Sequence, residues 1–170
     1  AEIYQNLLKS QTTLDQEIDA INFRIRVLTT AQDLLKASTK KTIEQEGVYL
    51  LNNDLKRQED FYQAKEFHID FRNNIAYISD KDAKYSASSS FYLKISARFS
   101  IFLSSLSIPN MRYPRFIFCD NMEDKGIEKI RAENFQRILV EEAEKYNSND
   151  YQMIYTTSFI PDELNIDKYT

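Results

Sequence analysis

The sequence predicts an α/β protein in which a helical arm precedes a short, mostly parallel β-sheet. Three observations support this class. Apolar residues recur at seven-residue intervals in the first part of the chain, which is typical of a coiled-coil helix. The period then changes to the alternation of a β-hairpin. Near the C-terminus, two short apolar segments flank a helical segment, an order that predicts parallel strands joined by a right-handed crossover.

The composition excludes several classes of protein. The chain has 170 residues, a net charge of −4 and only two glycines, Gly47 and Gly126, where average usage gives roughly a dozen. It therefore contains neither a G-x-G-x-x-G dinucleotide loop nor a G-x-x-x-x-G-K-[ST] phosphate loop. Its three prolines also favour long helices with short connections.

Cysteine, histidine and hydropathy narrow the classes further. Cys119 is the single cysteine, so no internal disulfide forms, and we expect a reducing, cytoplasmic location. No apolar run approaches 18 residues, so we expect no membrane partner. His68 is the only histidine, which argues against a histidine-based triad or zinc site and predicts a structural strand residue. The chain begins with Ala, which suggests a processed chain or an excised piece.

Residues 2–63 are predicted to be helical. A seven-residue repeat keeps one stripe facing a partner helix, so it favours a coiled-coil or helical-hairpin arm over one helix of a bundle. The repeat lapses at 38–42, where we expect a short break or a hinge, and Gly47 argues against an unbroken helix. The d positions are Leu7, Leu14, Ile21, Leu28 and Leu35, and the a positions are Tyr4, Gln11, Ile18, Ile25 and Gln32.

The remaining elements alternate strands with helices. A hairpin is predicted over 67–78, and a mostly buried helix from Phe91 to Leu106. The apolar run 116–119 predicts a strand buried on both faces. A helix follows from about Ile127 to Tyr146, then a second strand at 153–155. The inward residues of this helix are expected to be Ile130, Phe135, Ile138 and Leu139. We therefore divide the chain into an arm, 1–66, and an α/β part, 67–170.

Polar residues follow both predicted strands of the parallel pair. Ligands of open α/β sheets bind beyond the carboxyl ends of the strands, which here are 120–126 and 156–158. A carboxylate such as Asp120 at the tip of an apolar strand has the form of the Mg²⁺-binding Asp of P-loop ATPases. The alternative is that Asp120 and Asp124 serve only as loop and helix-capping residues.

A serine run, 86–90, precedes the buried helix. Hydroxyls and free N–H groups at a helix N-terminus favour anion binding, and Lys94 one turn later adds positive charge. The alternative is a plain N-cap with flexible serines.

Together these parts resemble a known family. The segments 88–95 (SSSFYLKI), 120–126 (DNMEDKG) and 155–158 (YTTS) resemble the C-terminal half of the ABC-type ATPase head of SMC- and RecN-type proteins. More narrowly, they are similar to bacterial SMC-like coiled-coil ATPases with a motif near D-N-x-E-D-K-G. The resemblance covers 67–170 through motifs and 1–66 only as generic coiled coil.

The resemblance implies roles for individual residues. Ser88, Ser89 and Ser90, with Lys94, would form the signature motif that reaches the γ-phosphate of ATP held by an opposing head. Asp120 would be the Walker B carboxylate, acting through Mg²⁺. Glu123 or Asp124 would lie near the D-loop and the attacking water, and Thr157 would replace a switch histidine. Asn121 would contact nucleotide where relatives carry the catalytic glutamate.

The implied function is an ATPase that is incomplete without its N-terminal lobe. It would bind Mg·ATP between two heads of a homodimer, held together by heads, coiled coil or both, and move its arms on DNA or an effector protein. Such heads serve DNA repair, chromosome maintenance and phage defence. The signature glycines are serines here and an amide cannot act as a general base. Glu123 would then have to serve as the base, or hydrolysis is slow or absent. Because the nucleotide-binding loop is not in this chain, we expect the chain alone to be inactive. The alternatives are a non-catalytic coiled-coil interaction module and a pseudo-ATPase switch.

Overall fold

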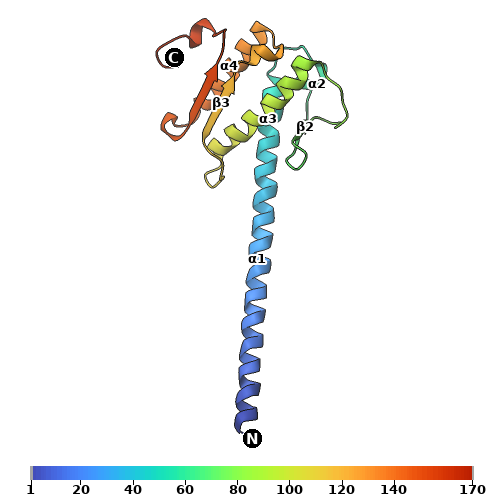
Figure 1. Cartoon of the computed structure of the whole chain (residues 1–170), viewed down its shortest axis with the longest axis vertical. Coiled ribbons are helices and arrows are strands. Elements are labelled where there is room, and N and C mark those ends of the chain that lie inside the picture. Colours follow the sequence, from blue (N-terminus) through green and yellow to red (C-terminus); the bar gives the residue numbers. More distant parts are fainter. Residues whose placement is uncertain (1, 170) are drawn as a thin grey trace. The chain divides into compact units, whose positions relative to one another are not determined.

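The computed structural model describes residues 2–169 and confirms the α/β class, with mostly helical content, a long N-terminal helix and a small parallel sheet (Figure 1). The chain forms two compact units, of which the first ends at Ser38 and the second begins at Thr39. The boundary expected after residue 66 therefore falls inside the second unit. No helix within residues 2–169 is long and apolar enough to cross a membrane.

The first helix, α1 (Glu2–Asn52), is continuous. The break expected at 38–42 and the interruption expected at Gly47 are therefore wrong. A hinge at 38–42 stays a prediction, and the boundary between the two units falls within this segment. Gly47 instead allows a close approach, because a Cβ on it would lie 2.1 Å from Cδ1 of the buried Phe67. The helix ends at Asn52 rather than at residue 63, and a short helix, α2 (Glu59–Tyr62), follows. Between them, Asp54 turns into the core.

The predicted hairpin is confirmed by β1 (His68–Asp70) and β2 (Ile75–Tyr77), which pair antiparallel. His68 is a strand residue, as expected, with ring nitrogens 3.1 Å from a Glu44 oxygen and 3.3 Å from a Glu66 oxygen. Phe71 is exposed because β1 ends at Asp70, whose Oδ1 accepts bonds from the two N–H groups of residues 72 and 73.

Two helices supply most of the core of the second unit. They are α3 (Ala87–Ser107) and α4 (Lys129–Ala143). Their aromatic rings pack edge to face, with centroids 5.5 Å apart for Phe99 and Phe135. Ile130 was expected to face inward but is 58% exposed, because α4 turns the row through Arg131 and Phe135 into the core. The inward positions of Phe135, Ile138 and Leu139 are confirmed.

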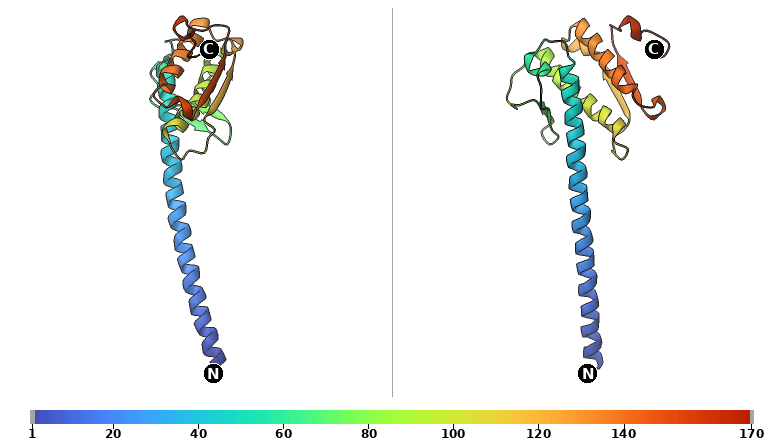
Figure 2. Two further views of the ribbon diagram at one scale, coloured as in Figure 1. Left: turned by 90° about the vertical axis from the view of Figure 1, so that its left-hand side faces the viewer. Right: turned by 180° about the vertical axis from the view of Figure 1, so that it is seen from behind.

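The small parallel sheet pairs β3 (Phe116–Asp120) with β4 (Gln152–Thr156) in register, as the strand–helix–strand order predicts. Burial of β3 on both faces, however, is wrong. Ile117 and Cys119 are buried, whereas Phe116 and Phe118 are 46% and 55% exposed. The reason is that α3 and α4 pack on one side of the sheet only (Figure 2). Short 3-10 helices, η1 (Met122–Lys125), η2 (Ser148–Asp150) and η3 (Asp162–Leu164), complete the unit.

Candidate functional site

Asp120 and Thr156 lie opposite each other at the carboxyl ends of the two parallel strands. Oγ1 of Thr156 donates a hydrogen bond of 2.5 Å to Oδ1 of Asp120. Alternate residues of a strand share a face, so Asp120 lies on the open face together with Phe118. Asp120 is exposed, and its carboxylate is therefore accessible from solvent.

Asn121 turns the chain away from the sheet. Its φ of 32° is left-handed, a conformation that Asn tolerates better than most residues. Its N–H donates to the carbonyl oxygen of Thr156 at 3.1 Å and lies 3.3 Å from Oγ1 of the same residue. The next residue, Met122, is fully buried and anchors η1, which ends at Lys125 and is followed by Gly126 with a φ of 80°.

Glu123 and Thr157 form the second pair of the site. Oε1 of Glu123 accepts hydrogen bonds from the Thr157 hydroxyl at 2.8 Å and from the N–H of Ser158. Oε2 of Glu123 is buried and has no hydrogen-bond partner among the described residues. Two of the residues singled out from the sequence, Glu123 and Thr157, are thus in direct contact. Asp120 and Asn121 bond instead to Thr156, the neighbour of Thr157, and within residues 2–169 no hydrogen bond joins Asp120 to Glu123 or Thr157.

The surroundings of Glu123 favour its charged form. Burial by itself disfavours the carboxylate, but hydrogen bonds from the backbone N–H groups of Glu123 and Ser158 and from the Thr157 hydroxyl outweigh it, so the pKa of Glu123 is lowered. A carboxylate with a lowered pKa is a weaker proton acceptor. Glu123 is consequently ionised and well oriented, but a poor general base.

Gln136 on α4 supports this pair from the core and was missed by the sequence analysis. Its side chain is buried, and Nε2 donates to the carbonyl oxygen of Phe159 at 2.9 Å and lies 3.4 Å from Oγ1 of Thr157. The Thr157 hydroxyl is also 2.8 Å from the Phe159 carbonyl oxygen. Because a hydroxyl carries one hydrogen, Thr157 can donate to Glu123 or to Phe159, but not to both at once.

The serines of the run 86–90 have different positions: one caps a helix, one is buried and two are half-buried. Ser86 is the N-cap of α3, and its Oγ accepts the N–H of Ser89 at 3.2 Å. The Ser89 side chain is buried, with Oγ 3.5 Å from Nη1 of Arg131. Ser88 and Ser90 are half-buried. The plain N-cap expected as an alternative is therefore present at Ser86, and of the serines at 88–90 only Ser88 and Ser90 are accessible.

A buried ion pair connects the end of α1 with α4. Nε and Nη2 of Arg131 donate to the carboxylate of Asp54 at 2.9 and 2.5 Å, and both residues are buried. The guanidinium also lies 4.4 Å from the ring centroid of Tyr92. This pair was not predicted from the sequence, although an arginine four residues before Phe135 in the apolar row of a helix was a signal for it.

The two other residues singled out from the sequence lie apart from these contacts. Lys94 on α3 and Asp124 in η1 are both exposed. Within residues 2–169 neither makes a hydrogen bond or ion pair with Asp120, Glu123 or Thr157. The described residues also contain no cluster of three or more His, Cys, Asp or Glu side chains able to hold a metal ion on their own.

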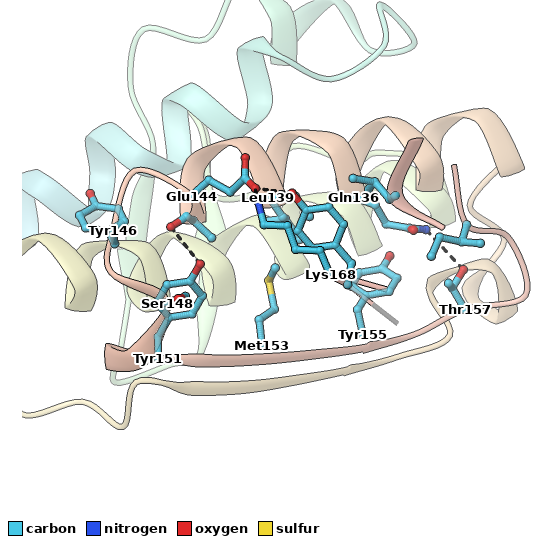
Figure 3. Close-up of a pocket in the computed structure, with 15 residues that line it drawn as sticks. Gln136, Leu139, Glu144, Tyr146, Ser148, Tyr151, Met153, Tyr155, Thr157 and Lys168 are labelled. Atoms are coloured by element: carbon cyan, nitrogen blue, oxygen red, sulfur yellow. Dashed lines mark hydrogen bonds and ion pairs between the residues drawn. The ribbon is translucent and has the colours of Figure 1, made fainter. Parts of the chain in front are cut away.

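A cavity of about 710 Å³ adjoins the site. Figure 3 shows Tyr151, which directly precedes β4, and Met153 and Tyr155 of β4 projecting into it, across from α4. The Tyr155 hydroxyl is buried with no hydrogen-bond partner among the described residues, and its pKa is raised by that burial. Gln136 and Thr157 line the cavity at one end, so it is continuous with the site.

Comparison with known protein families found no family that matches this chain, and comparison with curated proteins found no match either.

Proposed function

We propose that this chain is the C-terminal lobe of an SMC-like, ABC-type ATPase head together with the end of its coiled-coil arm. The complete protein would bind and hydrolyse Mg·ATP between two engaged heads, and engagement would move the arms on DNA or on a partner protein. One observation carries the proposal: Asp120 bonds to Thr156, and Glu123 bonds to Thr157, at the carboxyl ends of adjacent parallel strands, where open α/β sheets bind ligands.

Asp120 and Thr156 are the residues that would hold Mg²⁺. A single exposed carboxylate beside a hydroxyl fits this ion, which keeps several waters and is usually bound by one or two carboxylates together with substrate phosphates. The ion would supply positive charge to the phosphates of ATP. Thr156 holds the Asp120 carboxylate in place through its 2.5 Å hydrogen bond.

Glu123 and Thr157 would position the attacking water. Oε2 of Glu123, which is buried and has no hydrogen-bond partner among the described residues, would accept a hydrogen bond from this water. Two hydrogen-bond donors at Oε1 orient Glu123. Asn121 would occupy the place of the catalytic glutamate, and its amide cannot act as a general base. Because the pKa of Glu123 is lowered, we expect slow hydrolysis. This observation favours a second candidate, a nucleotide-binding switch that turns over rarely.

The open sheet supports a missing lobe. Parallel sheets normally have both faces covered, and a pair of strands is marginal by itself. Here Phe116, Phe118 and Ile154 remain exposed on one face, by 46%, 55% and 38%. In our proposal the N-terminal lobe covers this face and brings the phosphate-binding loop. Ser88 and Ser90 are the serines available to an opposing head, since Ser89 packs against Arg131.

ATP turnover by the complete protein tests the proposal. We expect Asp120→Asn to lower turnover at least about 100-fold, because the residue that holds the metal loses its charge. Asp150→Asn is the matched control, because Asp150 is an exposed carboxylate just before the amino end of β4, and we expect full activity. Equal turnover of Asp120→Asn and the wild type would reject the assignment.

A further inference from the structure

A second apolar stripe lies on α1, on the side opposite the predicted coiled-coil seam. Successive members are three and four residues apart, the spacing of one helix face. They are Ala20, Phe23, Val27, Thr30, Leu34 and Ala37. Its three large members, Phe23, Val27 and Leu34, are 63%, 50% and 68% exposed.

The geometry of an α-helix separates the two stripes. Val27 follows the seam residue Ile25 by two positions, which is about 200° around the helix. A partner that covers the seam therefore leaves the second stripe uncovered. The second stripe is also restricted in length, because the equivalent positions nearer the N-terminus are polar: Asn6, Lys9, Thr13 and Gln16.

Charges along one edge of the second stripe alternate in sign. Asp19, Arg26 and Asp33 precede Ala20, Val27 and Leu34 by one residue each, and all three are exposed. Asp33 makes one weak contact within the helix, 3.6 Å from Lys36, in which both side chains are about two-thirds exposed. An alternating edge of this kind is self-complementary only in particular alignments of two copies.

We propose that the second stripe binds the same stripe of a second copy of this chain, antiparallel and centred between Leu28 and Thr29. This alignment places Phe23 opposite Leu34 of the second copy and Val27 opposite its Thr30. It also places Arg26 beside Asp33 of the second copy, twice by symmetry. Asp19 then lies beside Lys40 of the second copy, since α1 is continuous through that residue.

The antiparallel alignment satisfies the charges better than the parallel one. Two parallel copies in register match Asp19 with Arg24, but they place Arg26 beside Ala31 and leave Asp33 without a basic partner. In the antiparallel alignment all three charges of the edge meet an opposite charge. The contact is separate from the seam, so it does not depend on the ATPase proposal.

Charge exchange tests the pairing in the full 170-residue chain. We expect Arg26→Glu, and separately Asp33→Arg, to weaken self-association about tenfold, because each creates two like-charge contacts. The double variant Arg26→Glu/Asp33→Arg restores opposite charges in the antiparallel alignment, so we expect its dissociation constant to return to within about threefold of the wild type. Lys9→Glu, outside the second stripe, is the control. Analytical ultracentrifugation measures all four. A double variant no better than either single variant would overturn the pairing.

Disulfide cross-linking tests the orientation. Cys119→Ala removes the native thiol, and Ala20→Cys or Ala37→Cys then adds one thiol to the second stripe. In the antiparallel alignment residue 20 meets residue 37, whereas like residues are about 26 Å apart. We therefore expect cross-linked dimers only in the mixture of the two variants. Cross-linking of each variant alone would indicate parallel copies, and none in any sample would indicate another partner; both results overturn the proposal.

Discussion

The Glu123 carboxylate accepts the Thr157 hydroxyl across 2.8 Å, joining the turn after β3 to the end of β4. The two residues are 34 positions apart in the chain, and they meet because β3 and β4 are parallel neighbours in register. The hydrogen bond uses Oε1, and Oε2 of Glu123 has no hydrogen-bond partner among the described residues.

The stability of the chain should depend on the ionisation of Glu123. Since the folded-state pKa of Glu123 is lowered, its contribution is present above the unfolded pKa, about 4.3, and is lost as the pH falls through the folded value. We expect Glu123→Gln to remove this part of the acid dependence of urea unfolding. Glu2→Gln, at the exposed start of α1, should leave the profile unchanged, and an identical profile for Glu123→Gln would contradict the hydrogen-bonded carboxylate.

The buried pair of Arg131 and Asp54 should be costly to break. Arg131→Met leaves the Asp54 carboxylate buried without its partner, and we expect a loss of about 3–5 kcal/mol in the free energy of unfolding. Arg137→Met breaks the exposed pair with Glu163 and should cost less than about 1 kcal/mol. Combining Asp54→Asn with Arg131→Met should cost less than the sum of the single losses. Equal small effects of Arg131→Met and Arg137→Met in urea unfolding would contradict the buried pair.

Glycine should be required at position 47, because the ring of Phe67 leaves no room there for a side chain. In Gly47→Ala the new methyl group would meet Cδ1 of Phe67 at 2.1 Å, so we expect a net loss of about 1–3 kcal/mol from overpacking. Alanine favours a helix by about 1 kcal/mol over glycine, which works against that loss. Phe67→Leu in the same chain should recover part of the stability in a thermal melt. A higher melting temperature for Gly47→Ala alone would show that the ring moves aside freely.

Cys119 should be unreactive in the folded chain. It is 4% exposed, and burial raises the pKa of its thiol to about 11, so little thiolate exists at pH 8. We expect a disulfide reagent to label Cys119 slowly in buffer and rapidly in urea. Because its folded pKa is raised, the neutral thiol is favoured, and stability should fall as the pH rises above the unfolded value of about 8.5. Rapid labelling of the native chain would contradict the burial of β3 on its inner face.

Local patterns predicted much of the fold. The seven-residue repeat predicted the helix of the arm. The change to alternating apolar and polar residues predicted the hairpin at Asp70 and Ile75. The boundary at Asn52 could not be predicted, since it depends on Asp54 pairing with an arginine 77 residues later. The exposure of one face of β3 could not be predicted either, because the apolar run FIFCD is compatible with a strand covered on one face or on both.

Part of the candidate site was also predicted, because parallel strands end at the same edge of a sheet. Asp120 ends β3 and Thr157 follows β4, so their place at the same edge of the sheet follows from the parallel order alone. Gln136 could not be found, because its role depends on which side of α4 faces Thr157. The inward turn of Ser89 depends on Arg131 in the same way.

ATP turnover by separated and joined lobes tests the central claim most directly. We expect the 170-residue chain alone to hydrolyse no ATP. If the complete protein joins it to a lobe with a G-x-x-x-x-G-K-[ST] loop, as we propose, that protein should hydrolyse ATP, and Asp120→Asn should abolish the hydrolysis. Turnover by the 170-residue chain alone, or an active complete protein indifferent to Asp120→Asn, would contradict the account.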